Sequence, residues 1–252
     1  MDIKNCAAIV TGGASGMGAA TAKLLSQAGA KVAIFDLDLN SANKLAKEIN
    51  GIAIACDVSK EESVENAVTE VTSRLGAARI CVNCAGIARA RRIVNKQGMM
   101  PLSEFRQVIE INLIGTFNVM RVAVAAMEKL TPDPETQERG VIINTASVAA
   151  YEGQIGQTAY SASKGGVVSM TLPAARELAQ FGIRVVTIAP GLVETPMLAE
   201  IPEAAREALA ATVPFPHRLA KPEEYAKLVL HILDNAMING EVIRLDGALR
   251  MS

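Results

Sequence analysis

The sequence contains no tryptophan, only three tyrosines and five phenylalanines, and its 252 residues include two histidines and four cysteines. So few cysteines exclude a scaffold held by disulfides and are typical of a protein from a reducing compartment. His217 and His231 stand apart from each other and from every cysteine, so we expect no metal site. The 25 basic and 26 acidic residues nearly balance, which gives no electrostatic reason to expect nucleic acid or an anionic membrane as a partner.

Two of the cysteines, Cys81 and Cys84, have the Cys-x-x-Cys spacing of a redox pair. They lie at the end of an apolar run, and no helix start is positioned to lower the pKa of a thiol there. We therefore interpret both as structural residues, with a redox pair as the alternative.

Long hydrophobic runs are missing as well. The run Val122–Met127 is far too short to cross a bilayer, so we expect no transmembrane segment. Met1 lies only a few residues before the first predicted strand, which argues against a secretory signal. The simplest expectation is a cytoplasmic protein, with the mitochondrial matrix as the alternative if a leader has been cleaved.

Short apolar or β-branched runs alternate along the whole chain with segments whose apolar residues recur at the spacing of a helix. This alternation predicts one α/β domain over residues 1–252, a Rossmann fold with a doubly wound parallel seven-stranded sheet and helices on both faces. The predicted strands are Ala7–Thr11, Lys31–Asp36, Ile52–Cys56, Ile80–Asn83, Val141–Thr145, Arg184–Ala189 and Val242–Leu245. The predicted helices are Gly18–Gln27, Ser41–Ile49, Lys60–Leu75, Ser103–Lys129, Thr158–Gln180 and Pro222–Leu233.

Two of these helices begin with a recognisable signal. Ser59 and Glu62 have the spacing of a capping box, which predicts a helix start at this point. Pro222 suits the first turn of the last predicted helix, where no backbone N–H is needed.

Three segments interrupt the alternation. Arg89–Met100 is a loop that carries four basic residues, and Thr131–Gly140 is a polar loop that we expect to be exposed. Pro190–Pro216 follows the end of a strand and contains a short predicted helix around Glu203–Ala211. Because ligands bind outside the carboxyl ends of such strands, we expect Pro190–Pro216 to cover the substrate.

The first predicted strand runs into a glycine-rich turn, with Gly12, Gly16 and Gly18 spaced as Gly-x-x-x-Gly-x-Gly. Without side chains there, the backbone and the following helix N-terminus can approach a pyrophosphate. The second strand ends in Asp36, whose carboxylate can bind ribose hydroxyls and would repel a 2′-phosphate. No Arg or Lys precedes Gly16, where the residue is Ser15, or follows Asp36, so the sequence predicts NAD rather than NADP.

The ends of the next two strands are further candidates for this site. Asp57 closes the third strand, where it can meet the adenine edge or cap the following helix, and the sequence leaves both open. The fourth strand ends in Asn83–Gly86, whose small residues allow the backbone to lie near a cofactor.

Tyr160 and Lys164 lie four residues apart in a predicted helix, so both project from one face. A positive charge about 4 Å from a phenol favours the phenolate by roughly 4 kcal/mol at an effective dielectric near 20. That energy lowers a tyrosine pKa by on the order of three units. The pair is therefore a candidate general acid and base near neutral pH, although an isolated Tyr-x-x-x-Lys also occurs on solvated helices.

The TGGASGMG turn, the NCAG strand end, Asn112, Ser147 and the Tyr160/Lys164 pair resemble the short-chain dehydrogenase/reductase family in order and approximate spacing. The stretches GVIINTASVAAYEGQIGQTAYSASKGG, RVVTIAPGL and NGEVIRLDGALRM are similar to a narrower group, the type 2 3-hydroxyacyl-CoA dehydrogenases or type 10 17β-hydroxysteroid dehydrogenases. The chain departs from the wider family at Cys84, where a second Asn is usual. At the position of Val193 the family often has a bulkier side chain. The smaller valine would make the wall around the nicotinamide looser.

This resemblance implies roles for the residues of the site. Tyr160 would exchange the proton at the substrate oxygen, and Lys164 would lower the pKa of Tyr160 and bind the nicotinamide ribose. Ser147 would polarise the substrate oxygen, so Ser147 and Tyr160 are the implied substrate contacts; a turn-forming serine is the alternative. Asn112 would position a water between Lys164 and solvent, or else it simply bends a helix. The implied cofactor-binding residues are Gly12, Ser15, Gly16, Met17, Gly18, Asp36, Asp57, Val58, Cys84, Ala85, Gly86, Tyr160, Lys164, Pro190, Gly191 and Val193.

The implied activity is hydride transfer between NAD and a secondary alcohol, foremost the oxidation of (S)-3-hydroxyacyl-CoA to 3-oxoacyl-CoA. A dehydrogenase of hydroxysteroids or of another secondary alcohol, and a dinucleotide-binding protein without turnover, are the alternatives. The basic loop Arg89–Lys96 is a candidate for CoA phosphates, with a solvated loop as the alternative. The resemblance also implies a homotetramer, with the apolar segment Ile243–Met251 as a candidate interface.

Overall fold

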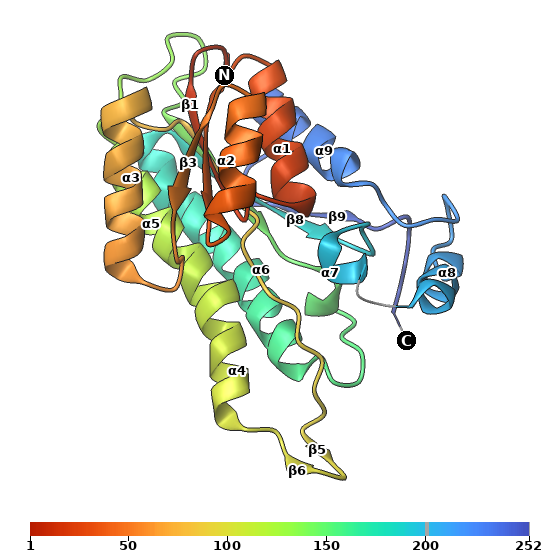
Figure 1. Ribbon diagram of the computed structural model, residues 1–252. Coiled ribbons are helices and arrows are strands. Elements are labelled where there is room, and N and C mark those ends of the chain that lie inside the picture. Colours follow the sequence, from red (N-terminus) through yellow and green to blue (C-terminus); the bar gives the residue numbers. More distant parts are fainter. Residues whose placement is uncertain (200–201, 252) are drawn as a thin grey trace.

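Parallel strands form the centre of the protein, whose computed structural model describes residues 1–199 and 202–251 (Figure 1). The strands of the main sheet are β1 (Ala7–Thr11), β2 (Lys31–Asp36), β3 (Ile52–Ala55), β4 (Ile80–Asn83), β7 (Gly140–Thr145), β8 (Ile183–Pro190) and β9 (Val242–Leu245). Their order is β3-β2-β1-β4-β7-β8-β9, and every neighbouring pair is parallel. The predicted fold class is confirmed, and each strand lies within one residue of its predicted bounds.

Helices cover both faces of this sheet (Figure 1). One face is covered by α1 (Gly16–Gln27), α2 (Leu39–Glu48) and α9 (Pro222–Asp234). The other face is covered by α3 (Glu61–Leu75), α5 (Gly115–Met127) and α6 (Thr158–Leu178). The remaining elements near the sheet are α4 (Leu102–Ile109), the π-helical turn η1 (Glu110–Ile114), and the 3₁₀ turns η2 (Val148–Ala150) and η3 (Ala179–Phe181).

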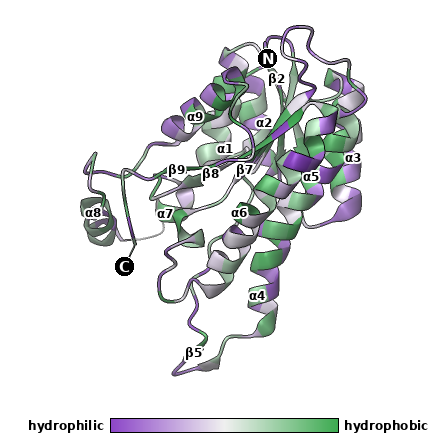
Figure 2. Cartoon of the chain, turned by 180° about the vertical axis from the view of Figure 1, so that it is seen from behind, coloured by the Kyte–Doolittle hydropathy of each residue, from purple (hydrophilic) through white to green (hydrophobic). Residues whose placement is uncertain are grey.

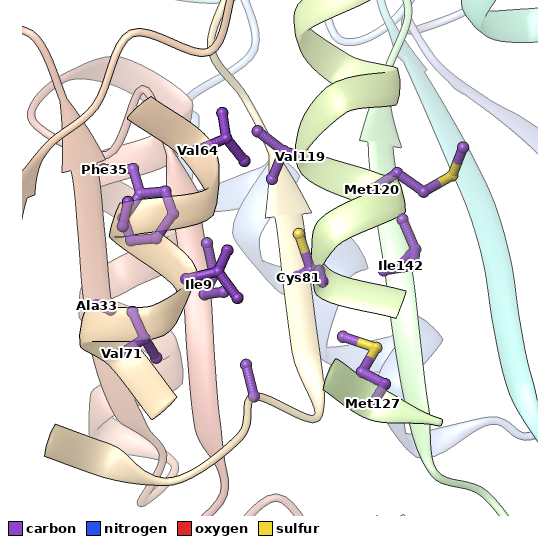
Figure 3. Packing of buried hydrophobic residues seen from close by; sticks show 14 of the residues in the cluster. Ile9, Ala33, Phe35, Val64, Val71, Cys81, Val119, Met120, Met127 and Ile142 are labelled. Atoms are coloured by element: carbon purple, nitrogen blue, oxygen red, sulfur yellow. The ribbon is translucent and has the colours of Figure 1, made fainter. Parts of the chain in front are cut away.

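Alternate residues of each strand pack into different halves of the core. Ala8 of β1 packs on the side of α1, α2 and α9, whereas the neighbouring Ile9 packs on the side of α3 and α5. Figure 3 shows this second half, where Ile9 and Cys81 of adjacent strands lie near Val71 and Val119 of the covering helices. Continuously apolar strands are thus buried on both faces, and the apolar area removed from water stabilises the sheet by about 25 cal/mol per Å².

The elements α4, η1 and α5 form one helical stretch, Leu102–Met127, close to the single helix predicted over Ser103–Lys129. By length and composition this stretch would suffice to cross a membrane, since it contains an 18-residue window with a mean hydropathy of 1.5. A search of the sequence for uninterrupted apolar runs does not find this stretch, because polar residues are distributed along it (Figure 2). In the structure α5 packs against α3 and α4 packs against α6, and 44% of the window is buried.

Two segments extend beyond the carboxyl ends of the strands (Figure 1). The basic loop contains a small antiparallel hairpin that the sequence does not predict, formed by β5 (Val94–Asn95) and β6 (Gly98–Met99). The predicted cover contains α7 (Pro196–Ala199) and α8 (Glu203–Ala211), the second of which matches the predicted short helix. Positions 200 and 201 of that cover lie outside the described residues.

One local prediction is wrong, and another holds only in part. Helix α3 begins at Glu61 without a side-chain cap, because the Ser59 hydroxyl donates to Asp57 Oδ1 at 2.7 Å instead of closing a capping box. The polar loop Thr131–Gly140 is not exposed throughout, since Glu138 is only 5% exposed. Its carboxylate accepts a hydrogen bond from Arg184 of β8, and this partner permits its burial.

Candidate active site

A cavity of about 800 Å³ lies at the carboxyl ends of β1, β2, β4, β7 and β8. In this sheet the strand order reverses between β1 and β4, and ligands bind where such a reversal leaves a crevice. All of the predicted cofactor-binding residues line the cavity, and so do Ser147, Tyr160 and Lys164. Asn112 does not line it; its side chain is fully buried behind the wall.

The glycine-rich turn between β1 and α1 leaves no room for side chains. A Cβ on Gly18 would lie 2.2 Å from the carbonyl oxygen of Gly12, and Gly16, the first residue of α1, has a positive φ of 51°. Only glycine meets both demands without strain. The bare backbone and the N-terminal end of α1 therefore face the cavity, an arrangement that suits an anionic pyrophosphate.

Asp36 at the end of β2 holds this turn in place. Its Oδ2 accepts a hydrogen bond from the backbone N–H of Ala14 at 3.0 Å, and its Oδ1 accepts one from the N–H of Asp38 at 3.0 Å. Each carboxylate oxygen has a second lone pair, so the group can still accept hydrogen bonds from ribose hydroxyls. Asp57 likewise lines the cavity, but its Oδ1 accepts hydrogen bonds from Ser59, so it also shapes the local turn.

Ser147, Tyr160 and Lys164 come together from two elements. Ser147 precedes η2, and its Oγ accepts a hydrogen bond from the N–H of Ala149 at 3.1 Å, the turn-forming contact of the alternative reading. The same side chain acts to lower the pKa of the Tyr160 phenol. Lys164 Nζ donates to the carbonyl oxygen of Thr145 at 2.7 Å and lies 5.8 Å from the centre of the Tyr160 ring.

The effect of Lys164 on Tyr160 differs from the expectation. Burial raises the pKa of Tyr160, and the hydrogen bond from Ser147 offsets only part of that rise. Burial also lowers the pKa of Lys164, to about 8. The predicted net lowering of the tyrosine pKa is therefore wrong for this arrangement, because burial of the phenol has the larger effect.

Asn112 lies in the π-helical turn η1, a distortion frequent at functional sites. Its Oδ1 accepts a hydrogen bond from the N–H of Ile87 at 2.8 Å, and its Nδ2 donates to the Ile87 carbonyl at 2.9 Å. The amide thereby fixes the chain that leaves β4. A Cβ on Gly86 in that chain would lie 3.6 Å from Lys164 Nζ, so the amide positions backbone beside the lysine.

A chain of hydrogen bonds behind the cavity includes a residue that sequence reasoning missed, Tyr225 of α9. The Thr145 hydroxyl donates to the Asn83 carbonyl at 2.6 Å, so at 2.7 Å its oxygen accepts from the Tyr225 hydroxyl. The Cys84 thiol in turn donates to Tyr225 at 3.6 Å. No local pattern marks Tyr225, which lies 80 residues beyond Thr145.

The structural interpretation of the cysteines is confirmed. All four thiols are free, and burial raises the pKa of Cys81 to about 12 and that of Cys84 in the same direction. Such thiols are poor nucleophiles at neutral pH. Residues 1–199 and 202–251 also contain no group of three His, Cys, Asp or Glu side chains that could hold a metal ion.

Of the basic loop, Arg89, Arg92 and Lys96 are exposed on or beside the hairpin. Arg91 is paired with Glu104 of α4 at 2.9 Å. Further residues line the cavity that the sequence does not single out, among them Lys60, Gln107, Glu110, Gln157 and Met251.

Comparison with known proteins places the chain among dehydrogenases. Residues 6–206 match the family model of the short chain dehydrogenases. The chain is 51% identical to 3-hydroxyacyl-CoA dehydrogenase type-2 of Homo sapiens, covering 99% of this chain and 97% of the human protein, and 51% identical to the Drosophila melanogaster protein of that name, covering 99% of each. The crystal structure of 3-hydroxyacyl-CoA dehydrogenase type-2 from Mycobacterium avium has a TM-score of 0.93 and 42% identity over 98% of this chain and 97% of that chain. A 3-ketoacyl-(acyl-carrier-protein) reductase from Brucella melitensis complexed with NADH has a TM-score of 0.86 and 32% identity over 99% of this chain and 100% of that chain.

Proposed function

Because this chain belongs to the short-chain dehydrogenase family, we propose that it interconverts (S)-3-hydroxyacyl-CoA and 3-oxoacyl-CoA. It is an NAD-dependent dehydrogenase by family, and its relatives named for 3-hydroxyacyl-CoA support this substrate. The observation that carries the proposal is one cavity in which Ser147, Tyr160 and Lys164 lie beside the glycine-rich turn and Asp36.

The residues at one end of the cavity suit a dinucleotide. The glycine-rich turn has no space for a side chain at Gly18 and has a positive φ at Gly16, and it presents a helix N-terminus to a pyrophosphate. The Asp36 carboxylate supports NAD over NADP because it would repel a 2′-phosphate. When bound, NAD supplies the hydride acceptor for oxidation, and NADH supplies the hydride for reduction.

Tyr160 handles the proton of the reaction. Oxidation of a secondary alcohol removes a hydride from the carbinol carbon and a proton from its hydroxyl, and we assign that proton to Tyr160 Oη. In reduction the Tyr160 hydroxyl returns a proton to the carbonyl oxygen. The Ser147 hydroxyl, whose oxygen is held by the Ala149 N–H, can donate to the same substrate oxygen and orient it.

Lys164 and Asn112 support this transfer. A lysine ammonium has three N–H donors, of which Thr145 uses one, so the others are available to a ribose hydroxyl and to the proton path. Asn112 positions the backbone at Ile87 beside this lysine. The water that the family resemblance implies between Asn112, Lys164 and solvent stays a prediction.

The basic hairpin supports the CoA thioester as substrate. Arg89, Arg92 and Lys96 carry exposed positive charge in the segment that follows Ala88 of the cavity wall, and guanidinium groups bind phosphate well. A second candidate function is oxidation of a hydroxysteroid or another apolar secondary alcohol. The apolar lining by Ile87 and Ile111 favours it, since such a surface accepts an uncharged ring system.

A panel of acetoacetyl-CoA, hydroxysteroids and simple secondary alcohols, followed by NADH absorbance, tests the proposal. We expect the highest kcat/KM for the acyl-CoA. We also expect Arg92→Ala to raise KM for acetoacetyl-CoA several-fold, with no effect on a small alcohol, because only the CoA carries phosphates. Lys129→Ala, an exposed cation after α5, is the control. Turnover of alcohols or steroids without acyl-CoA would reject the proposed substrate, and equal KM changes for both substrates would reject the role of Arg92.

Assembly and compartment complete the proposal. A homotetramer is supported by the half-buried edge strand β9 and by the exposed side chains of Ile114 and Phe117, which are 43% and 52% exposed. The mass of the particle in solution tests it, and a monomer would reject it. The free cysteines suit a reducing compartment such as the cytoplasm or the mitochondrial matrix.

A further inference from the structure

We propose that the segment Asp246–Met251 is latched by Glu152 and Arg244 as the substrate-side wall of the cavity, and that Met251 sets the size of the acyl group accepted. This inference rests on the proposed function, because it assigns part of the same cavity to the acyl chain. It concerns a segment that follows the last strand, far in sequence from Ser147 and Tyr160.

The latch is built on Arg244 of β9. Its Nη1 and Nη2 each donate to one oxygen of Glu152 at 2.9 Å, the paired geometry that makes arginine–carboxylate contacts strong and directional. The same guanidinium donates from Nε to Asp246 at 2.6 Å and from Nη2 to the carbonyl oxygen of Leu249 at 2.9 Å. One side chain thus ties Glu152 to both ends of the turn that leads to Met251.

Secondary contacts keep the segment in this shape. The ring of Tyr151 packs against the Arg244 guanidinium, with 5.3 Å between the ring centre and Cζ. Ala248 has a positive φ of 67°, which an alanine adopts only where its surroundings hold it, and its N–H donates to Asp246 Oδ1 at 3.0 Å. Arg250 also reaches Asp246, at 3.2 Å, but it is 59% exposed and adds little.

The position of the latch places the segment at the reactive end of the cavity. Glu152 follows η2, the turn that begins after Ser147. Asp246 packs against Gly191 at the end of β8, where a Cβ would lie 2.9 Å from Asp246 Cβ. Met251 then lines the cavity together with Ser147 and Gly191, whereas Asp36 lies strands away at the end of β2.

Met251 is suited to limit an apolar chain. Its side chain is unbranched, flexible and polarisable, so it can fill the space beside a short acyl group. The neighbouring wall is also apolar, with Val148, Ala149 and Leu192. Each methylene accommodated or refused in such a pocket changes the discrimination between substrates by roughly 10- to 200-fold.

The first test compares Met251→Ala and Met251→Phe on a series of 3-oxoacyl-CoA substrates from short to long chains, with NADH. We expect Met251→Ala to raise kcat/KM for long over short chains by about tenfold, and Met251→Phe to lower that ratio, since each variant changes the space beside the acyl group. The dissociation constant of NADH should stay within about twofold in both. If the unmodified chain turns over acyl-CoA and both variants keep its chain-length profile, the inference is overturned and the proposed function stands. Absence of acyl-CoA turnover in the unmodified chain would overturn both.

The second test addresses the latch. Arg244→Met should shift the chain-length ratio in the direction of Met251→Ala, because the wall loses its anchor, and Glu152→Gln should give a smaller shift because it still accepts one hydrogen bond. Arg121→Met, which breaks an arginine pair with Glu61 and Glu65 on α3, is the matched control. A ratio unchanged in Arg244→Met would show that the segment is held without Glu152. A general loss of kcat with an unchanged ratio would also contradict the latch.

Discussion

A single buried lysine dominates the electrostatics of the site. Lys164 is 4% exposed, and the Thr145 carbonyl, to which its ammonium donates, does not compensate for the burial of the charge. Its pKa therefore falls from 10.5 to about 8, while burial moves the pKa of Tyr160 upward.

The lowered pKa of Lys164 predicts how the reaction depends on pH. Lys164 is charged below about pH 8 and neutral above it, so the rate of acetoacetyl-CoA reduction at saturating NADH should be level near pH 7 and fall above about pH 8. Circular dichroism over the same range is the control for unfolding. A reduction rate that stays level to pH 10 would contradict the assigned protonation state.

The same shift affects stability. Between about pH 8 and 10.5 the unfolded chain keeps the lysine proton while the folded chain releases it, so this group's contribution to the free energy of unfolding rises with pH there. Below pH 8 the charged, buried Lys164 costs stability. A residue retained at such a cost is typical of a functional site rather than of packing.

At the scale of elements, Arg184 of β8 joins three parts of the fold. Its Nε donates to Glu138 at 2.5 Å, and its Nη1 donates to the carbonyls of Ile232 at 2.9 Å and Ile238 at 2.8 Å. The bonds to Ile232 and Ile238 satisfy carbonyls at and beyond the end of α9 that the helix leaves unpaired. Burial would raise the pKa of Glu138, but its pKa is lowered because the hydrogen bond and charge of Arg184 outweigh the desolvation.

Removal of this partner should destabilise the fold. We expect Arg184→Met to lower the free energy of unfolding by about 3 kcal/mol at pH 7, because the buried Glu138 carboxylate loses its arginine partner. The Glu138 contribution should vanish as pH falls through the lowered pKa of its carboxyl.

Urea unfolding measures the loss, with Arg121→Met as the control, because its glutamate partners are 75% and 51% exposed and such pairs contribute below about 1 kcal/mol. An equal loss in both variants would contradict the account of Arg184.

Elements were predictable from the sequence where one local pattern decides them. Buried strands such as β7 are continuously apolar, and the glycine-rich turn has fixed spacing, so both could be placed within a residue. The capping-box prediction at Ser59 was wrong because the Ser59 hydroxyl donates its hydrogen bond to the neighbouring Asp57. Tyr225 and Met251 reach the site from distant segments through tertiary packing, which no local pattern records.

The predicted pKa of Tyr160 failed for a related reason. Residue spacing placed Lys164 on the same helix face, but it gave neither the burial of the two groups nor the direction of the ammonium toward Thr145. Electrostatic effects depend on these tertiary details more than on sequence separation. The site residues could thus be predicted in position, and their electrostatics could not.

At the scale of the whole molecule, the parallel sheet is a rigid platform, and several short or irregular segments lie beyond one end of it. The carboxyl ends of β1, β2, β4, β7 and β8 form the cavity, which α7 and Met251 also line. The hairpin β5–β6 and the helix α8 lie farther from the sheet (Figure 1). Reactive groups on the sheet and the long helix α6 hold their geometry, while the surrounding segments determine which substrate enters.

The decisive measurement is the rate of acetoacetyl-CoA reduction by Tyr160→Phe, with NADH binding measured in parallel by fluorescence. We expect the rate to fall by roughly a hundredfold to ten-thousandfold, because the phenol that delivers the proton is gone. The dissociation constant of NADH should stay within about twofold of that of the unmodified chain. A variant that keeps its full rate would contradict the assignment of Tyr160 as the proton-transferring group.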